Sequence, residues 1–449
     1  MSEFAAVVDA VRARVVPDDA ERARLDAVAA TLRERAEAAV ADLAVDADVL
    51  LVGSTARGTW LAGDRDIDLF VRFPADLPRE KLEAYGLEVG HTVLPEGHEE
   101  FAEHPYVKGS FEGFDVDLVP CYDVATANDI QSAVDRTPFH TAYLEARLDD
   151  DLADEVRVAK AFLKAVGAYG SDLRTQGFAG YLTELLVLEH GGFRELVEAA
   201  ADWQPPVVFD PESHGRKSFD DALVVVDPTD PERNVAAALS ERNFARLVHY
   251  ARDLLADPRE ALFEPRTLDP LDAEDVREHL RARGTHPVAV RFDAPDVVED
   301  QLYPQLDKSL GGLAGELDRR GFAPLRSLRV ANETAVLFVE CSVAELPAIE
   351  RHGGPPVGVR EHAEGFYEAY RDTDAYGPFL DGDRYAVERE REFRTPEAFA
   401  ASDALFDVAL GPHVESALEE GYEVLTGEEV AELADEFGRE LAAYFDPVP

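Results

Sequence analysis

Cysteine is almost absent from the sequence, since Cys121 and Cys341 are the only two cysteines among 449 residues. Two thiols so far apart exclude a disulfide scaffold and a closely spaced zinc site, so we expect both to be buried and reduced. No apolar run approaches the roughly 20 residues that a membrane-spanning helix needs. Glu3 and Asp9 also make the N-terminal stretch unlike a signal peptide. The sequence therefore predicts a cytoplasmic protein without a membrane segment.

Positive charge is scarce as well. Lys and Arg number 44 against 92 Asp and Glu, which gives a formal net charge of −48. Such a chain repels nucleic acid at low salt, but at molar salt the Debye length shrinks to about 3 Å and only local contacts count. The acidic residues are spread along the chain and are not gathered in one tail. We therefore interpret the charge as halophilic adaptation to a salt-filled cytoplasm.

The remaining composition is that of a globular protein, with 46% apolar residues. The length predicts about three domains. No internal repeat or low-complexity tract is visible.

Two carboxylates project together from one expected strand at 65–73. From Ile67 onward apolar residues alternate on one face, so Asp66 and Asp68 share the other. A cation between them relieves their repulsion, and Mg²⁺ suits one or two carboxylates together with phosphate oxygens. An isolated Asp-x-Asp is also typical of a solvated strand edge, which is the competing interpretation.

A second stretch at 114–120 repeats the design. Val116 and Leu118 face inward, whereas Asp115 and Asp117 share the opposite face. A carboxylate pair and a third carboxylate on a later strand are typical of two-metal nucleotidyl transfer. On geometry alone, either Asp115 or Asp117 supplies the third ligand.

The apolar run 49–52 leads into a Gly53-Ser54 turn, ahead of the first carboxylate strand. A glycine-led turn presents unpaired N–H groups to phosphates. Arg57 follows, where its guanidinium reaches either a triphosphate or a surface carboxylate.

The segment from His140 to about residue 257 has helical periodicity. His140, Lys160 and Tyr169 are each compatible with an ordinary structural role. Together they supply a donor, a cation and an amphipathic ring, which suit a triphosphate and a ribose. The other expected helices are 78–89, 148–166, 178–188, 231–239, 298–320, 361–370, 396–409 and 413–443, and the other expected strands are 105–111, 224–227, 288–290, 327–330 and 334–342.

The ordered set of motifs resembles the archaeal (class I) CCA-adding enzymes of the DNA polymerase beta nucleotidyltransferase superfamily. The Gly-Ser turn, the Asp-x-Asp pair and Asp117 carry the resemblance to the superfamily. The stretches that resemble the CCA-adding branch are 136–141, Lys160 with 169–170, 177–181, 227–235 and 354–357. The likeness runs over nearly the whole chain.

The resemblance implies an enzyme that adds C, C and A to the tRNA 3′ end from CTP and ATP without a nucleic-acid template, releasing pyrophosphate by a two-metal mechanism. It implies Mg²⁺ as the cofactor and selects Asp117 over Asp115. The implied catalytic and metal-binding residues are Asp66, Asp68 and Asp117. The implied nucleotide-binding residues are Gly53, Ser54, Arg57, His140, Lys160, Tyr169 and Arg233. The chain departs from the family at one ligand, since the family more often has Glu where Asp66 stands.

We expect a multidomain α/β protein with a polymerase-beta-like palm, a helical central domain and an α+β body with a ferredoxin-like tail. The expected bounds are 1–139, 140–257 and 258–449, with the tail at about 287–360. The partners that the resemblance implies are the tRNA acceptor stem and 3′ end, ATP and CTP. The sequence leaves the oligomeric state open, a homodimer being one alternative.

Two interpretations remain for the arginine-bearing segments: they bind the tRNA backbone, or they are solvated helix faces. These segments are 277–291 and 319–329, together with Arg351, His352 and Arg360. Two functional alternatives remain: a poly(A) polymerase or oligoadenylate-synthase-like nucleotidyltransferase, and a non-catalytic RNA-binding module that has kept a palm.

Overall fold

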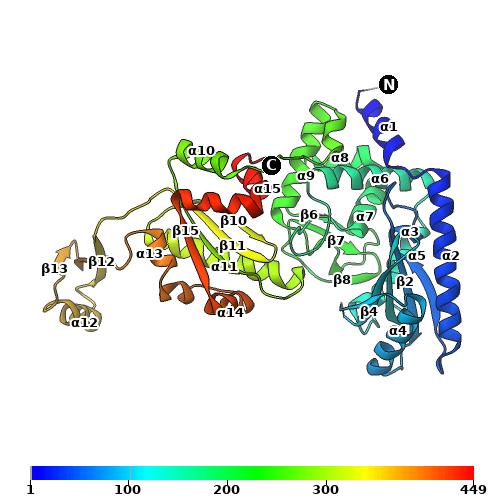
Figure 1. Cartoon of the computed structure of the whole chain (residues 1–449), viewed down its shortest axis with the longest axis horizontal. Coiled ribbons are helices and arrows are strands. Elements are labelled where there is room, and N and C mark those ends of the chain that lie inside the picture. Colours follow the sequence, from blue (N-terminus) through cyan, green and yellow to red (C-terminus); the bar gives the residue numbers. More distant parts are fainter. Residues whose placement is uncertain (1–2, 102) are drawn as a thin grey trace. The chain divides into compact units, whose positions relative to one another are not determined.

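The computed structural model describes residues 3–101 and 103–449. The chain divides into two compact units after Arg266, and Pro449 belongs to the first. Each unit has hydrophobic clusters of its own. Figure 1 labels the helices and strands along the chain.

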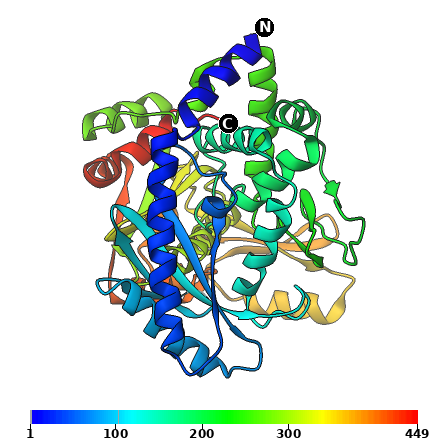
Figure 2. The same cartoon turned by 90° about the vertical axis from the view of Figure 1, so that its right-hand side faces the viewer.

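The first unit begins with two helices, α1 (Glu3–Val15) and α2 (Asp19–Ala41). Asp18 separates them because its carboxylate caps α2, accepting a hydrogen bond from the backbone N–H of Glu21 at 2.8 Å. Figure 2 views the unit from the side of α2, which runs along the sheet.

A five-stranded mixed sheet follows, in the order β1-β2-β5-β4-β3. Only β2 and β5 pair in parallel. Four of its strands were predicted, whereas β3 was missed because its sequence, His-Glu-Glu-Phe, has little apolar alternation. The strands are β1 (Asp48–Val52), β2 (Asp66–Pro74), β3 (His98–Phe101), β4 (Pro105–Phe111) and β5 (Phe114–Asp123).

One face of this sheet is packed and the other carries the polar residues. Helices α2 and α4 (Arg79–Val93) cover the first face, where Ile67, Leu69, Val116 and Leu118 are buried. Because side chains alternate along a strand, the even-numbered aspartates of β2 and the odd-numbered aspartates of β5 lie on the opposite face. The predicted alternation is therefore confirmed in both strands.

Helices dominate the rest of the first unit and share one core with α1. They are α5 (Thr137–Glu145), α6 (Asp150–Ala165), α7 (Gly180–His190), α8 (Phe193–Ala200) and α9 (Glu241–Ala256). The short helix α3 (Gly53–Ala56) lies in the turn after β1. A small sheet adds β6 (Val207–Phe209), β7 (Leu223–Asp227) and β8 (Asp230–Asn234).

The helix predicted over 231–239 is wrong. Residues 230–234 form β8, which pairs antiparallel with β7, and a turn follows. The side chain of Asn234 accepts hydrogen bonds from the backbone N–H groups of Val225 and Ala236, both at 2.9 Å, and donates to the carbonyl of Leu223 at 3.0 Å. These bonds tie the segment to β7 in place of a helix.

The second unit is built on a four-stranded antiparallel sheet in the order β10-β11-β9-β15. Its two faces pack into separate hydrophobic clusters. The strands are β9 (His286–Asp293), β10 (Pro324–Ala331), β11 (Thr334–Cys341) and β15 (Tyr422–Thr426), and the helices are α10 (Ala273–Arg283), α11 (Glu299–Arg320), α13 (Pro396–Ala400), α14 (Pro412–Glu420) and α15 (Ala434–Phe445).

Two expected C-terminal helices are shorter than predicted. The segment 396–409 holds only α13 and a 3₁₀ turn at Asp403–Asp407, and 413–443 is interrupted by β15. Gly421 ends α14 with a φ of +152°, and Leu425 is buried in the sheet. Pairing with β9 therefore prevails over a helical pattern of local origin.

A separate three-stranded sheet, β12-β14-β13, follows β11 in sequence with helix α12. The elements are β12 (Ile349–Pro356), α12 (Arg360–Tyr370), β13 (Tyr376–Asp381) and β14 (Arg384–Glu390). The expected tail at about 287–360 thus spans parts of both sheets. Among the described helices, none is long and apolar enough to cross a membrane.

Candidate active site

The parallel pairing of β2 and β5 brings the predicted carboxylates together. Asp68 lies opposite Asp117, and Asp66 lies opposite Asp115. Neighbouring strands are about 4.8 Å apart, so the side chains of Asp68 and Asp117 are direct neighbours on the face turned away from α2 and α4. Asp115 is exposed, whereas Asp68 and Asp117 are partly buried.

Electrostatics mark the same group. Burial, followed by the charges of Asp117 and Asp66, raises the pKa of Asp68 to about 6. Burial also raises the pKa of Asp66 and that of Asp117. Each residue therefore carries its charge at a cost that a bound cation removes.

Lys108 is a neighbour of this group that sequence reasoning missed. It lies opposite Asp117 in the β4–β5 pairing, and its Nζ is 3.7 Å from Asp117 Oδ1. Its charge lowers the pKa of Asp117 against the effect of burial. The available signal was Val107, which is buried in β4 and therefore places the next residue, Lys108, on the opposite face of the strand.

The carboxylates fit a magnesium site by their chemistry. Among the described residues, no three His, Cys, Asp or Glu side chains converge closely enough to form a ready-made metal cage. Three hard oxygen ligands on adjoining strands, with pKa values raised by burial and by neighbouring carboxylates, are nevertheless the donor set that Mg²⁺ prefers. Their mutual repulsion favours separation until a cation is bound.

The Gly53 turn lies directly against Asp68. Gly53 has a φ of +73°, and a Cβ added there would stand 2.0 Å from Asp68 Oδ2. Only glycine therefore fits without moving the carboxylate. Ser54 follows within α3, and Thr55 Oγ1 donates to the carbonyl of Asp66 at 2.7 Å, which joins the turn to β2.

Arg57 ends α3 and points to a buried carboxylate that was not predicted. Its Nε donates to Glu184 Oε2 at 2.8 Å, and its Nη1 donates to Thr141 Oγ1 at 3.4 Å. Its charge also lowers the pKa of Asp68. The guanidinium therefore contacts Glu184 directly and acts on Asp68 through its charge.

Lys160 is buried on α6. Its Nζ donates to Glu184 Oε1 at 3.1 Å and to the carbonyl and hydroxyl of Thr59, both at 3.0 Å. Burial lowers the pKa of Lys160, whereas the Glu184 charge opposes this effect. The structure thus brings two predicted residues, Arg57 and Lys160, to the same glutamate.

His140 and Arg233 meet at a second buried carboxylate, Asp227. The Nε2 of His140 and the Nη1 of Arg233 are each 2.8 Å from Asp227 Oδ2. The His140 ring also stacks on Tyr181, with ring centroids 3.9 Å apart. Burial lowers the pKa of His140, whereas the facing Asp227 carboxylate opposes this effect.

Tyr169 lies in an isolated bridge with Phe178, and its side chain is half-buried. The Nζ of Lys164 is 5.4 Å from its ring centroid. A Cβ on Gly180 would stand 3.1 Å from the Tyr169 hydroxyl, so a glycine lets this ring approach α7. Burial raises the pKa of Tyr169, and the nearby charges of Glu184, Asp64 and Asp66 raise it further.

A cavity of about 750 Å³ adjoins the Asp227 group. Three cations line it, and each is paired with a carboxylate: Arg136 with Asp230, Lys217 with Glu232 and Arg233 with Asp227. The Nε of Arg136 is buried without a hydrogen-bond partner among the described residues. The cavity therefore combines three ion pairs with the stacked rings of His140 and Tyr181, and it suits a planar ligand that carries polar groups.

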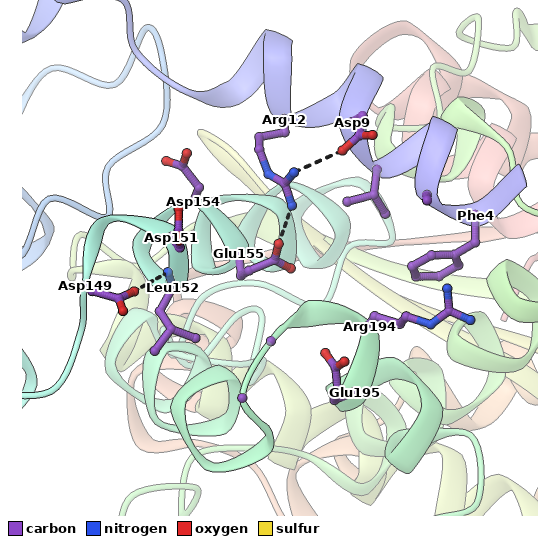
Figure 3. A pocket seen from close by; sticks show the side chains of 14 residues that line it. Phe4, Asp9, Arg12, Asp149, Asp151, Leu152, Asp154, Glu155, Arg194 and Glu195 are labelled. Atoms are coloured by element: carbon purple, nitrogen blue, oxygen red, sulfur yellow. Dashed lines mark hydrogen bonds and ion pairs between the residues drawn. The ribbon is translucent and has the colours of Figure 1, made fainter. Parts of the chain in front are cut away.

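Another cavity, of about 570 Å³, has the opposite character. Figure 3 shows Asp149, Asp151 and Glu195 around it, with Arg12 engaged by Asp9 and Glu155. It is lined by none of the predicted site residues. We therefore place the candidate site at the β2–β5 carboxylates and the two buried acid groups.

Family models match three successive parts of the chain. The model described as "Nucleotidyltransferase domain" matches residues 33–140. The model "tRNA nucleotidyltransferase, second domain" matches 154–264, and "CCA-adding enzyme, C-terminal domain" matches 283–427. The matches follow the order palm, helical region and second unit.

Curated relatives are similar over the full length. A CCA-adding enzyme of Haloarcula marismortui is 62% identical over 463 aligned positions, which cover 100% of this chain and 99% of the relative. The CCA-adding enzyme of Halorubrum lacusprofundi is 61% identical, with 100% of both chains covered. That of Methanoregula boonei is 45% identical over 88% of this chain and 86% of its own.

Proposed function

Because the chain belongs to the family of archaeal CCA-adding enzymes, we propose that it builds the 3′ end of tRNA by adding C, C and A from CTP and ATP and releasing pyrophosphate. Similarity along the entire chain to enzymes of that name carries this proposal. The neighbouring positions of Asp68 and Asp117 support it, because nucleotidyl transfer needs clustered carboxylates.

Asp66, Asp68 and Asp117 are the residues that would hold Mg²⁺. The bound ions supply charge stabilisation at the phosphate oxygens and at the attacking hydroxyl. Asp117 itself accepts the proton of the terminal 3′-hydroxyl of the tRNA.

The nucleotide lies against two sets of residues. We assign the triphosphate to Gly53, Ser54, Arg57 and Lys160, and the ribose and base to His140, Tyr169 and Arg233. Arg57 is the best supported of these residues, since its charge lowers the pKa of both Glu184 and Asp68. Holding the α-phosphate in line with the 3′-oxygen is then mostly a matter of positioning.

In this assignment residues 1–139 are catalytic, 140–257 form the nucleotide pocket and 258–449 bind tRNA. The tRNA-binding arginines are engaged by acidic neighbours: Arg281 contacts Glu274 and Glu428, and Arg329 contacts Asp307. Backbone phosphates would replace these carboxylates. We assign the protein to the cytoplasm because mature tRNA functions there.

The test is incubation of the full chain in molar KCl with tRNA that lacks its 3′ terminus. CTP alone should give two added cytidines and then arrest, and ATP should complete the end with one adenosine. A poly(A) polymerase or oligoadenylate synthase would extend with ATP alone and without this arrest. Absence of pyrophosphate release under Mg²⁺ would instead favour a non-catalytic RNA-binding module.

The carboxylate assignment has its own test. Asp68→Ala and Asp117→Ala should each abolish CMP incorporation while tRNA binding, measured by filter retention, stays intact. Near-normal turnover in either variant would show that the metal ligands lie elsewhere.

A further inference from the structure

Glu184 is a carboxylate in an apolar setting. Its side chain is fully buried on α7, where Leu182, Leu185 and Leu186 belong to the hydrophobic core. Burying a charge costs several kcal/mol unless partners compensate for the lost water. A glutamate kept at such a place therefore needs specific partners.

Those partners come from two other segments. Oε1 accepts from Lys160 Nζ at 3.1 Å and from the hydroxyl of Thr59, and Oε2 accepts from Arg57 Nε at 2.8 Å. Helix α7 is thereby joined both to α6 and to the turn after α3. Both carboxylate oxygens are used.

Lys160 and Arg57 differ in the number of hydrogen-bond donors that remain unused. An ammonium has three donors, and those of Lys160 meet Glu184 and the two oxygen atoms of Thr59. Arg57 uses Nε for Glu184 and Nη1 for Thr141. Within residues 3–101 and 103–449, its Nη2 has no hydrogen-bond partner.

Charge points the same way. Two cations share one buried carboxylate, so the group retains about one positive charge. That charge acts on the aspartates, since Arg57 lowers the pKa of Asp68. An anionic ligand placed between Arg57 and cations bound to Asp68 would neutralise this remaining positive charge.

We propose that Glu184 is a positioning residue for the incoming nucleotide. It holds the Nε edge of Arg57, so that the outer Nη2 is presented to the triphosphate beside Asp68. It also keeps Lys160 as a fixed second cation behind Arg57. The inference rests on the proposed function, because it takes CTP and ATP as the ligands.

The competing role is purely structural, in which Glu184 only ties α7 to the turn. Both roles predict a loss of stability when the carboxylate is removed, since two buried cations lose their partner. Only the positioning role predicts weaker nucleotide binding in the molecules that remain folded. The decisive measurement is therefore the KM for each nucleotide alongside the Tm.

The experiment uses Glu184→Gln in the full chain, with truncated tRNA, CTP, ATP and Mg²⁺ in molar KCl. The KM for CTP and the KM for ATP should both rise about tenfold or more, which is the scale of a lost charge-assisted hydrogen bond. The KM for tRNA should change less than about twofold. Unchanged nucleotide KM values with a lowered Tm would overturn the proposal.

Glu340→Gln is the matched control. Glu340 is also a fully buried glutamate, and it accepts from Arg283 Nε at 2.6 Å, from Arg283 Nη2 at 2.8 Å and from the Tyr444 hydroxyl at 2.7 Å. It lies in the second unit, on β11. Its loss should lower the Tm and leave the nucleotide KM values unchanged.

Arg57→Lys keeps the test decisive if Glu184→Gln fails to fold. A lysine retains the charge but cannot bind Glu184 through one nitrogen while presenting another. The nucleotide KM should rise about tenfold with little change in Tm, and wild-type nucleotide KM values would overturn the proposal. If the wild-type protein adds neither C nor A, the proposed function is wrong. If the wild-type protein is active and both variants keep its nucleotide KM, only the positioning role of Glu184 is wrong.

Discussion

Single residues at this site are arranged for ligand binding at the expense of stability. Asp66, Asp68 and Asp117 share one face of adjoining strands, where burial and mutual repulsion raise their pKa values. Lys108 relieves this repulsion only in part, since its Nζ is 3.7 Å from Asp117 Oδ1. We therefore expect substitutions here to move activity and stability in opposite directions.

Asp68→Asn should stabilise the metal-free protein at pH 7.5 by roughly 1–2 kcal/mol. The pKa of Asp68 is raised to about 6 in the folded protein from an ordinary value of 3.8. Its contribution to stability is thus fully present below about pH 4 and is lost as the pH rises through about 6. Urea unfolding in EDTA between pH 4 and pH 8 measures this difference.

Asp115→Asn is the control for that experiment, because Asp115 is an exposed aspartate on the adjoining strand β5. It should change neither the pH profile nor CMP incorporation by more than about twofold. A stability profile of Asp68→Asn parallel to that of the wild type would contradict the interpretation, as would loss of activity in Asp115→Asn.

Asp227→Asn should impair nucleotide selection more than folding. The carboxylate holds His140 and Arg233 at 2.8 Å each, and an amide loses the charge-assisted part of both bonds, about 1–2 kcal/mol apiece. We expect roughly tenfold or greater loss in kcat/KM for CTP and ATP, with misincorporation of UMP or GMP rising. Competition between nucleotides on truncated tRNA measures this ratio.

Asp210→Asn serves as the comparison, since the Asp210 side chain accepts hydrogen bonds from the backbone N–H groups of His214 and Gly215 in the neighbouring turn. Its discrimination between nucleotides should equal that of the wild type. Equal discrimination in Asp227→Asn would show that His140 and Arg233 do not depend on this carboxylate.

At the scale of elements, local pattern predicted most of the first unit. Alternation identified β2 and β5 and the face that each presents, because side-chain direction has a period of two. It does not reveal which strands pair, so Lys108 and the acid groups at Glu184 and Asp227 were missed. Their partners are distant in sequence: Glu184 is 127 residues from Arg57.

The errors lie where tertiary contacts override a local preference. Asn234 binds the backbone of β7, which turns an expected helix start into β8. The strand β15 interrupts an apolar helical pattern because it completes the sheet beside β9. Both outcomes depend on neighbours that no local window of sequence contains.

Gly53→Ala tests the contact between the turn and the carboxylate strand. Its Cβ would stand 2.0 Å from Asp68 Oδ2, so Asp68 has to move and CMP incorporation should fall by about a hundredfold or more. The left-handed φ adds a stability cost of about 1 kcal/mol. Steady-state kinetics and thermal unfolding measure the two effects separately.

Gly63→Ala separates the effect of backbone strain from the effect of the steric clash with Asp68. Gly63 also has a left-handed φ, +88°, but a Cβ there meets nothing within 4 Å. The variant should lose a similar amount of stability and keep activity within about twofold. Equal activity in the two variants would show that the collision with Asp68 does not matter.

For the whole molecule, charge is the dominant property. With a net charge of −48, the chain repels itself in dilute buffer. The arginines of the second unit offset this locally, as Arg281 does with Glu428 and Arg329 with Asp307. Exposed pairs of this kind contribute little individually, so screening by salt should matter more.

The Tm should therefore rise by several degrees as KCl increases from about 0.2 M to about 2 M. Calorimetry at constant pH measures the change. Sucrose at matched osmolality is the control, because it favours burial without screening charge. A Tm that is insensitive to KCl, or that responds equally to sucrose, would contradict a charge-based origin.

The parallel pairing of β2 with β5 has a consequence for biogenesis. Parallel neighbours cannot be closed by a hairpin, so the growing polypeptide lacks its acidic cluster until the segment beyond residue 117 has been made and has docked. A slip of one position would turn Asp117 toward the leucine-rich interior. A newly made molecule that is catalytically active must therefore have paired β2 with β5 in the correct register.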